Sequence, residues 1–94
     1  MKWIYKITWP NKLIYIGKDE TGDITYFGSP SKIDEIAKDF SPKELRDMII
    51  RREILWESET VTNKDLDRKE KEFIKYFQSN NPEIGYNRSP KFKP

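Results

Sequence analysis

Two short apolar and aromatic runs at the start of the chain, separated by polar and turn residues, predict a pair of β-strands. Lys2 to Thr8 and Leu13 to Gly17 are rich in Ile, Tyr and Trp, residue types that pack well on a pleated surface. Pro10-Asn11-Lys12 lies between the two runs and supplies residues typical of turns. We therefore predict a β-hairpin with a three-residue loop.

The loop length fixes which residues of this hairpin face each other. It places Tyr5 opposite Gly17 and Ile7 opposite Tyr15. Because side chains alternate between the two faces of a strand, Trp3, Tyr5, Tyr15 and Gly17 then share one face. Glycine has no side chain, so we expect an open, shallow recess in which both phenol oxygens reach one ligand.

The other face of the hairpin carries Ile4, Ile14 and Ile16. Apolar residues on both faces indicate a sheet that helices cover on at least one side. Ser31 is placed to cap a first helix, in which apolar residues recur at helical spacing, namely Ile33, Ile36, Ala37 and Phe40. Ser41-Pro42-Lys43-Glu44 then has the form of a capping box with proline at the first helical position, which predicts a second short helix.

The stretch from Met48 to Thr60 fits two patterns. Leu45, Met48, Ile49 and Arg52 have the spacing of a continuing helix, whereas Ile50, Arg52, Ile54 and Trp56 alternate as in a strand. We favour a strand from Ile50 to Glu59.

A final helix is predicted to open near Thr62 or Asn63 and to stop at Asn80-Asn81-Pro82. Its apolar stripe consists of Leu66, Phe73, Ile74 and Phe77, and Glu70 falls on the same stripe. A carboxylate on a core-facing stripe costs free energy unless it has a counter-charge, a metal or hydrogen bonds. Together these elements predict an α+β fold, a small three-stranded antiparallel sheet flanked by helices.

The composition excludes several kinds of chemistry but does not indicate a binding partner. At 94 residues the chain is expected to form one domain, residues 1–94, with one modest core. Cysteine and histidine are absent, which excludes disulfides, zinc fingers and imidazole catalysis. The formal net charge is only +2, so charge alone does not indicate nucleic-acid binding. No run is apolar and long enough to span a bilayer and no secretion signal is evident, so we expect a cytoplasmic protein.

Four short motifs occur in an informative order. They are Trp3-Ile4-Tyr5, Tyr15-Ile16-Gly17, Glu70 followed by Phe73 and Ile74, and Gly85-Tyr86-Asn87. In this order and spacing the chain resembles the GIY-YIG nuclease superfamily, the catalytic domain of some phage homing endonucleases, excision-repair nucleases and restriction enzymes. The resemblance extends over nearly the whole chain.

Two departures from the family pattern affect the expected site. Trp3 stands where the family usually has glycine. Most members also carry an arginine about ten residues after the second tyrosine, whereas Gly22 to Tyr26 contains none. The run Tyr26-Phe27-Gly28-Ser29 resembles that of a sub-group of the family. Lys18 is our first choice for the missing cation, with Arg46, Arg51 and Arg52 as alternatives.

The resemblance implies a divalent-metal-dependent DNA endonuclease. Its catalytic residues would be Tyr5 as general base, Tyr15 as the residue that orients water or phosphate, Lys18, and Glu70 as the metal ligand. The substrate-binding residues would be Gly17, Arg46, Arg52 and Asn87. A single glutamate ligand suits magnesium, with manganese as a substitute. A phenol ionises at about pH 10, so a tyrosine base needs a nearby cation.

Simpler interpretations stay open for the same residues. Tyr5 and Tyr15 are also consistent with cross-strand packing, and Glu70 with an ion pair along its helix. Asn87 is also consistent with a turn residue. A nucleic-acid-binding module without catalysis and a protein-interaction domain are the alternative functions. Cutting both DNA strands would require a homodimer or two sequential events, and site choice would require a separate DNA-targeting partner.

Overall fold

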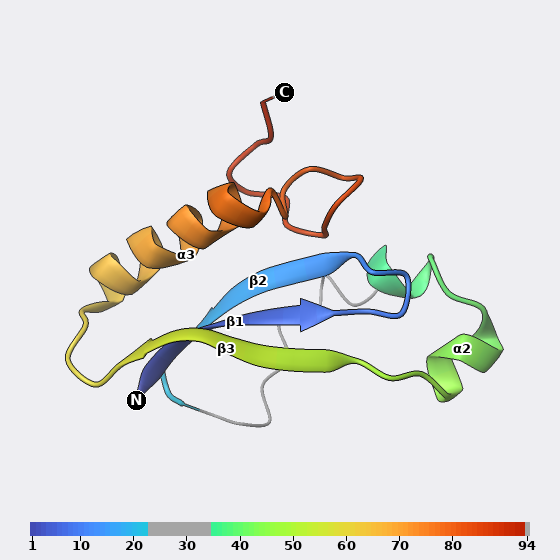
Figure 1. Cartoon of the computed structure of the whole chain (residues 1–94), viewed down its shortest axis with the longest axis horizontal. Coiled ribbons are helices and arrows are strands. Elements are labelled where there is room, and N and C mark those ends of the chain that lie inside the picture. Colours follow the sequence, from blue (N-terminus) through green and yellow to red (C-terminus); the bar gives the residue numbers. More distant parts are fainter. Residues whose placement is uncertain (23–34, 94) are drawn as a thin grey trace.

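The computed structural model describes residues 1–22 and 35–93. These form a small α+β fold with a three-stranded antiparallel sheet (Figure 1). The elements in chain order are β1 (Lys2–Thr8), β2 (Ile14–Asp19), α2 (Pro42–Arg46), β3 (Arg51–Ser58) and α3 (Asn63–Phe77). Residues 35–37 are also helical. The predicted cap at Ser31 and the run Tyr26-Phe27-Gly28-Ser29 lie outside the described residues.

The β1–β2 hairpin has the predicted register. Tyr5 pairs with Gly17 and Ile7 with Tyr15. The backbone N–H of Trp9 donates to the carbonyl of Leu13 at 3.1 Å, which closes the loop. β2 continues to Asp19, two residues beyond the predicted end.

β3 pairs with the other side of β1, so β1 is the central strand and the order is β2-β1-β3. The strand predicted from Ile50 to Glu59 is confirmed, and the competing helical pattern over the same residues is wrong. A register shift between Ile4 and Tyr5 of β1 interrupts the pairing with β3. Such irregularities add local twist to a sheet.

Both later helices begin where their capping residues predict. The Ser41 side chain accepts from the Glu44 N–H at 3.1 Å, and the Glu44 carboxylate accepts from the Ser41 N–H at 2.9 Å, which completes the capping box of α2. Thr62 caps α3 by accepting from the Asp65 N–H. α3 ends at a left-handed Gln78, two residues before the predicted stop. No helix among the described residues is both long and apolar enough to cross a bilayer.

Each face of the sheet carries its own apolar cluster. α3 covers one face, where Leu66 and Ile74 pack against Ile4 and Ile16. The other face carries a larger cluster that includes the two segments flanking α2, and its buried members are Trp3, Tyr5, Ile7, Trp9, Ile36, Phe40 and Tyr86. Coverage of the sheet by helices is therefore confirmed.

The segment after α3 runs along the outer edge of β2. The Ile14 N–H donates to the Ile84 carbonyl at 3.1 Å, and the Tyr86 N–H donates to the Ile14 carbonyl at 2.8 Å. Gly85 lies between them, where a Cβ would overlap the carbonyl oxygens of Ser79 and Ile14. Glycine is therefore required for the chain to pass this close to β2.

Candidate functional site

Tyr5 and Gly17 form the centre of the candidate site. Their strands pair so that the Tyr5 ring extends across β2, and a Cβ placed on Gly17 would overlap the Cζ and hydroxyl oxygen of Tyr5. Only glycine leaves room for the phenol at this position. The ring end of Tyr5 therefore lies directly above the backbone of an edge strand.

The recess predicted above Gly17 is not open. The space above Gly17 is filled by the Tyr5 ring itself. Tyr5 is 1% exposed, because the aromatic cluster of this face packs around it. The prediction of an open recess was wrong. Gly17 has no side chain to fill this space, but the Tyr5 ring on the opposite strand is long enough to fill it.

Tyr15 lies beside Tyr5 on the same face. The ring centroids are 6.4 Å apart with the planes tilted by 46°, which is a favourable separation for aromatic side chains. Tyr15 is only partly buried. The two signature tyrosines are thus brought together as predicted, with Tyr15 the more accessible of the two.

Lys18 extends from the opposite face of β2, toward α3. Its ammonium forms ion pairs with Asp67 of α3 and, at 3.4 Å, with Glu20. The hydrogen bond to Asp67 raises the pKa of Lys18, and the negative charge of Glu70 adds to the rise. The same hydrogen bond lowers the pKa of Asp67. Lys18 therefore stays charged in the neutral range, beside a small group of carboxylates.

Glu70 is the member of that group carried by the core-facing stripe of α3. It lies one helical turn from both Leu66 and Ile74, which are buried, and it is itself partly exposed. Its negative charge contributes to the raised pKa of Lys18, which belongs to the edge strand β2. Glu70 and the two tyrosines consequently lie on different faces of the sheet, with β2 between them.

Asn87 fixes the backbone of β2 immediately before Gly17. Its Oδ1 accepts from the Ile16 N–H at 2.8 Å and its Nδ2 donates to the Ile16 carbonyl at 2.9 Å. Asn87 is 4% exposed, so both bonds are shielded from water. Its observed contact is with the edge strand, and this contact positions Gly17 beneath Tyr5.

Tyr86, the middle residue of the motif Gly85-Tyr86-Asn87, connects three distant segments. Its hydroxyl donates to Asp39 Oδ2 at 2.6 Å and accepts from Asn11 Nδ2 at 2.9 Å, and its ring meets that of Trp9 edge-on. Burial, followed by the bond to Asp39, raises the pKa of Tyr86 to about 12. Neither this tyrosine nor Asp39 was predicted as a site residue, and no local pattern in the sequence pairs them.

The candidate cations are separated by the fold. Arg52 of β3 lies on the tyrosine face, where its guanidinium carbon is 6.0 Å from the centre of the Trp3 ring. Arg46 ends α2, whose residues are all unburied and which stands away from α3 (Figure 1). Arg46 therefore lies apart from the other candidate residues. Lys18 and Arg52 lie on opposite faces of the sheet.

The carboxylates near Lys18 are suited to weak binding of a magnesium ion and do not form a closed cage of protein ligands. No group of three or more carboxylates among the described residues is arranged to hold a metal. Magnesium usually takes one or two carboxylates, keeps several waters and uses substrate phosphates as ligands. Glu70, with Asp67 one turn before it on α3, fits that donor set. Asp67 was missed in the sequence, although helical spacing places it beside Glu70.

Comparison with known proteins adds no assignment. No family model, no curated protein and no solved structure matches this chain. The candidate site therefore depends on the motifs and on the geometry described above.

Proposed function

We propose that this protein is a divalent-metal-dependent DNA endonuclease of the GIY-YIG type, which hydrolyses phosphodiester bonds. The observation that carries the proposal is the stacking of the Tyr5 phenol above Gly17, with Tyr15 in ring contact. A lysine and a glutamate approach the same edge strand from its other face. The hydroxyl groups thus lie on one face of a short piece of β2 backbone, and the cation and carboxylate groups lie on its other face.

The edge of β2 offers a place for the phosphate. The N–H groups of Ile14 and Ile16 point away from β1, toward the C-terminal segment. Because strand backbone groups alternate in direction, the N–H of Lys18 points outward as well. Beyond Asn87, none of the described segments pairs with this edge, so we place a phosphate oxygen opposite that N–H.

The chain's own residues would divide the work of hydrolysis. Tyr5, once ionised to the phenolate, would accept a proton from the attacking water, and Tyr15 would orient the water or the phosphate. Lys18 would hold a non-bridging oxygen through its ammonium and its outward N–H, which stabilises charge that grows on the phosphate. Arg52 is the alternative cation, since it lies on the tyrosine face.

Glu70, assisted by Asp67, would hold the magnesium, with manganese as a substitute. When bound, the ion would act as a Lewis acid toward the phosphate and assist departure of the leaving oxygen. Lys18 pairs with Asp67. For the ion to bind, Asp67 therefore has to release Lys18 or contact Lys18 and the ion together. This competition predicts weak metal binding that tightens when DNA is present.

Nicking of supercoiled plasmid by the purified protein tests the proposal. Wild type should convert supercoiled DNA to open circles in magnesium or manganese, and Tyr5→Phe and Glu70→Ala should each reduce the rate at least ~100-fold. If wild type and both variants are equally inert across metals and substrates, the nuclease proposal is wrong.

A nucleic-acid-binding module without catalysis is the second candidate. The observation that favours it is the burial of Tyr5, which is 1% exposed, because a general base has to reach its water. DNA binding that weakens steeply with salt, without nicking under any metal, would support this candidate. As a nuclease, the protein would need a homodimer or two sequential events to cut both strands, and a separate DNA-targeting partner to select a site.

A further inference from the structure

The outer face of α3 carries a line of positive charge. Lys64, Arg68, Lys71 and Lys75 follow one another at spacings of four, three and four residues. At 3.6 residues per turn these positions lie within about 60° of one another around the helix. The buried Leu66 lies on the opposite side and the buried Ile74 about a quarter of a turn away. All four basic residues are exposed, so the basic line faces solvent along the helix.

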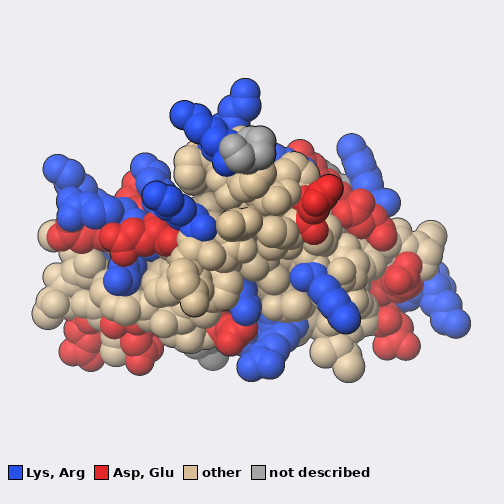
Figure 2. All heavy atoms as spheres, turned by 45° about the horizontal axis from the view of Figure 1, so that its top comes forward, with Lys and Arg blue, Asp and Glu red and all other residues tan. Residues whose placement is uncertain are grey.

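This line leads into a hollow between the end of α3 and the C-terminal tail. The hollow has a volume of about 480 Å³ and is lined by Lys71, Lys75, Gln78, Asn80, Lys91 and Lys93, together with two tail residues. No carboxylate lines it among the described residues. Figure 2 shows blue side chains gathered at the C-terminal end of the chain, at the top of the view.

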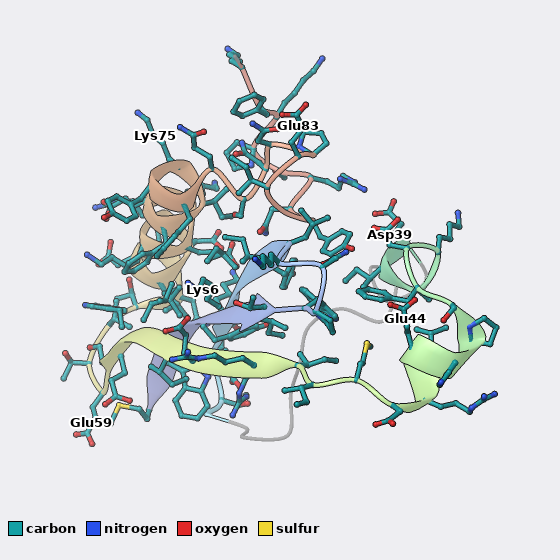
Figure 3. All side chains as sticks on the ribbon, turned by 45° about the vertical axis from the view of Figure 1, so that its right-hand side comes forward. Lys6, Asp39, Glu44, Glu59, Lys75 and Glu83 are labelled. Carbon is teal, nitrogen blue, oxygen red and sulfur yellow. The ribbon has the colours of Figure 1, made fainter. Side chains whose placement is uncertain are left out.

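The fold holds the two pairs of lysines together. Asn80 donates its side-chain amide to the Pro90 carbonyl at 2.7 Å, which fixes the tail against the turn after α3. Figure 3 labels Lys75 at the end of α3 nearest this tail. Lys91 and Lys93 are thereby kept beside Lys75, from which they are sixteen and eighteen residues distant in sequence.

The four lysines of the hollow are weakly compensated. None of them forms an ion pair with a described carboxylate, although the charge of Lys71 lowers the pKa of Asp67 one turn away. Like charges held close together destabilise the compact state. A surface that keeps four ammonium groups around one hollow is therefore suited to a polyanion.

We propose that this basic hollow and the adjoining face of α3, together the α3–tail surface, bind the sugar-phosphate backbone of DNA beside the cleavage site. This inference rests on the proposed function and names the surface that holds its substrate. From Lys64 to Lys75 the helix spans about 16 Å, or about five base pairs at 3.4 Å per base pair. Lys71 adjoins Asp67, which pairs with Lys18, so the surface is continuous with the candidate site.

Salt-dependent binding to a labelled duplex, measured by fluorescence anisotropy with chelator and no divalent metal, tests the proposal. Each phosphate contact contributes about 0.9 to the slope of log K against log salt concentration. Lys71→Gln/Lys75→Gln should therefore flatten the slope by about 1.8, and Lys91→Gln/Lys93→Gln by the same amount. The matched control is Lys38→Gln/Lys43→Gln, which removes two exposed charges at α2 and the turn before it and should leave the slope unchanged.

The outcomes separate this proposal from the nuclease proposal. Equal slopes for the two lysine pairs of the hollow and for the control pair, absence of DNA binding by wild type, or preferential binding to phosphatidylserine vesicles would each overturn the proposed role of the α3–tail surface. Flattened slopes without any nicking would support the surface and refute the nuclease. Nicking with unchanged slopes would do the reverse. Circular dichroism of each pair variant checks that α3 is intact.

Discussion

The Tyr5 phenol lies across the neighbouring strand directly above Gly17, in the space that any side chain at that position would occupy. The two residues come from different signature motifs, and their contact explains why a tyrosine and a glycine occur together in this register. Asn87 adds a third motif, because its amide holds the backbone of Ile16 beside Gly17. The three motifs therefore meet at one edge strand.

Gly17→Ala should lower the free energy of unfolding by about 1–3 kcal/mol, because the new methyl group overlaps a buried ring that has little room to move. The measurement is urea unfolding followed by tryptophan fluorescence. In a Tyr5→Leu background the ring is gone, so the same substitution should be neutral or slightly stabilising, as glycine-to-alanine changes are where the backbone permits them. Equal costs in both backgrounds would show that the ring is not the obstacle.

Asn87→Ala should expose the edge of β2. Loss of both amide bonds leaves the buried N–H and carbonyl of Ile16 without these partners, a cost of about 1–3 kcal/mol. Hydrogen exchange resolved by residue should show faster exchange of the Ile16 amide, while amides shared between β1 and β3 change only as far as global stability requires. Unchanged protection at Ile16 would contradict the assigned contact.

Tyr86→Phe removes a hydroxyl that bonds to Asp39 and Asn11, and should cost about 1–3 kcal/mol at pH 7. The pKa of Tyr86 is raised from 10.0 to about 12 in the folded state, so the folded state retains this proton longer than the unfolded chain. The stabilisation is therefore complete below about pH 10 and is lost as pH rises toward 12. Unfolding in urea at pH 9.5 to 12 should show a smaller decline for Tyr86→Phe than for wild type; parallel declines would contradict the shift.

Substitution of Arg52 and of Arg46 tests which cation replaces the arginine of the family pattern that is missing here. If Arg52 stabilises the phosphate from the tyrosine face, Arg52→Gln should reduce nicking by roughly 10- to 1000-fold. Arg46→Gln removes the same charge from α2 and should leave the rate within about twofold, because α2 stands away from the other candidate residues (Figure 1). Lys18→Gln belongs in the same series. Loss of activity with Lys18→Gln alone would assign the role to Lys18.

Local sequence signals predicted most of the secondary structure. The three-residue loop fixed the Tyr5–Gly17 pairing, which is confirmed, and the capping box at Ser41 and Glu44 started α2 as expected. These features are set by residues close together in the chain, and short-range hydrogen bonds decide them.

Long-range arrangement was less accessible. The sequence indicated that Glu70 lies on an apolar stripe, but it did not indicate that α3 covers the face opposite Tyr5 and Tyr15. It also gave no sign that Asn87 bonds to β2 or that Tyr86 bonds to Asp39. Such contacts depend on how separate elements pack, and no periodicity within one element encodes them.

The proposal that Glu70 holds the catalytic metal is tested most directly by comparing two glutamates of α3 that differ in position. Glu70 lies on the core-facing stripe near Lys18, whereas Glu72 is exposed and pairs with Lys69 at 3.6 Å. Plasmid nicking is measured over a manganese titration for wild type, Glu70→Gln and Glu72→Gln. We predict that Glu70→Gln loses at least ~100-fold in rate while Glu72→Gln keeps the wild-type rate. Nicking by Glu70→Gln at the wild-type rate and metal dependence would contradict the account.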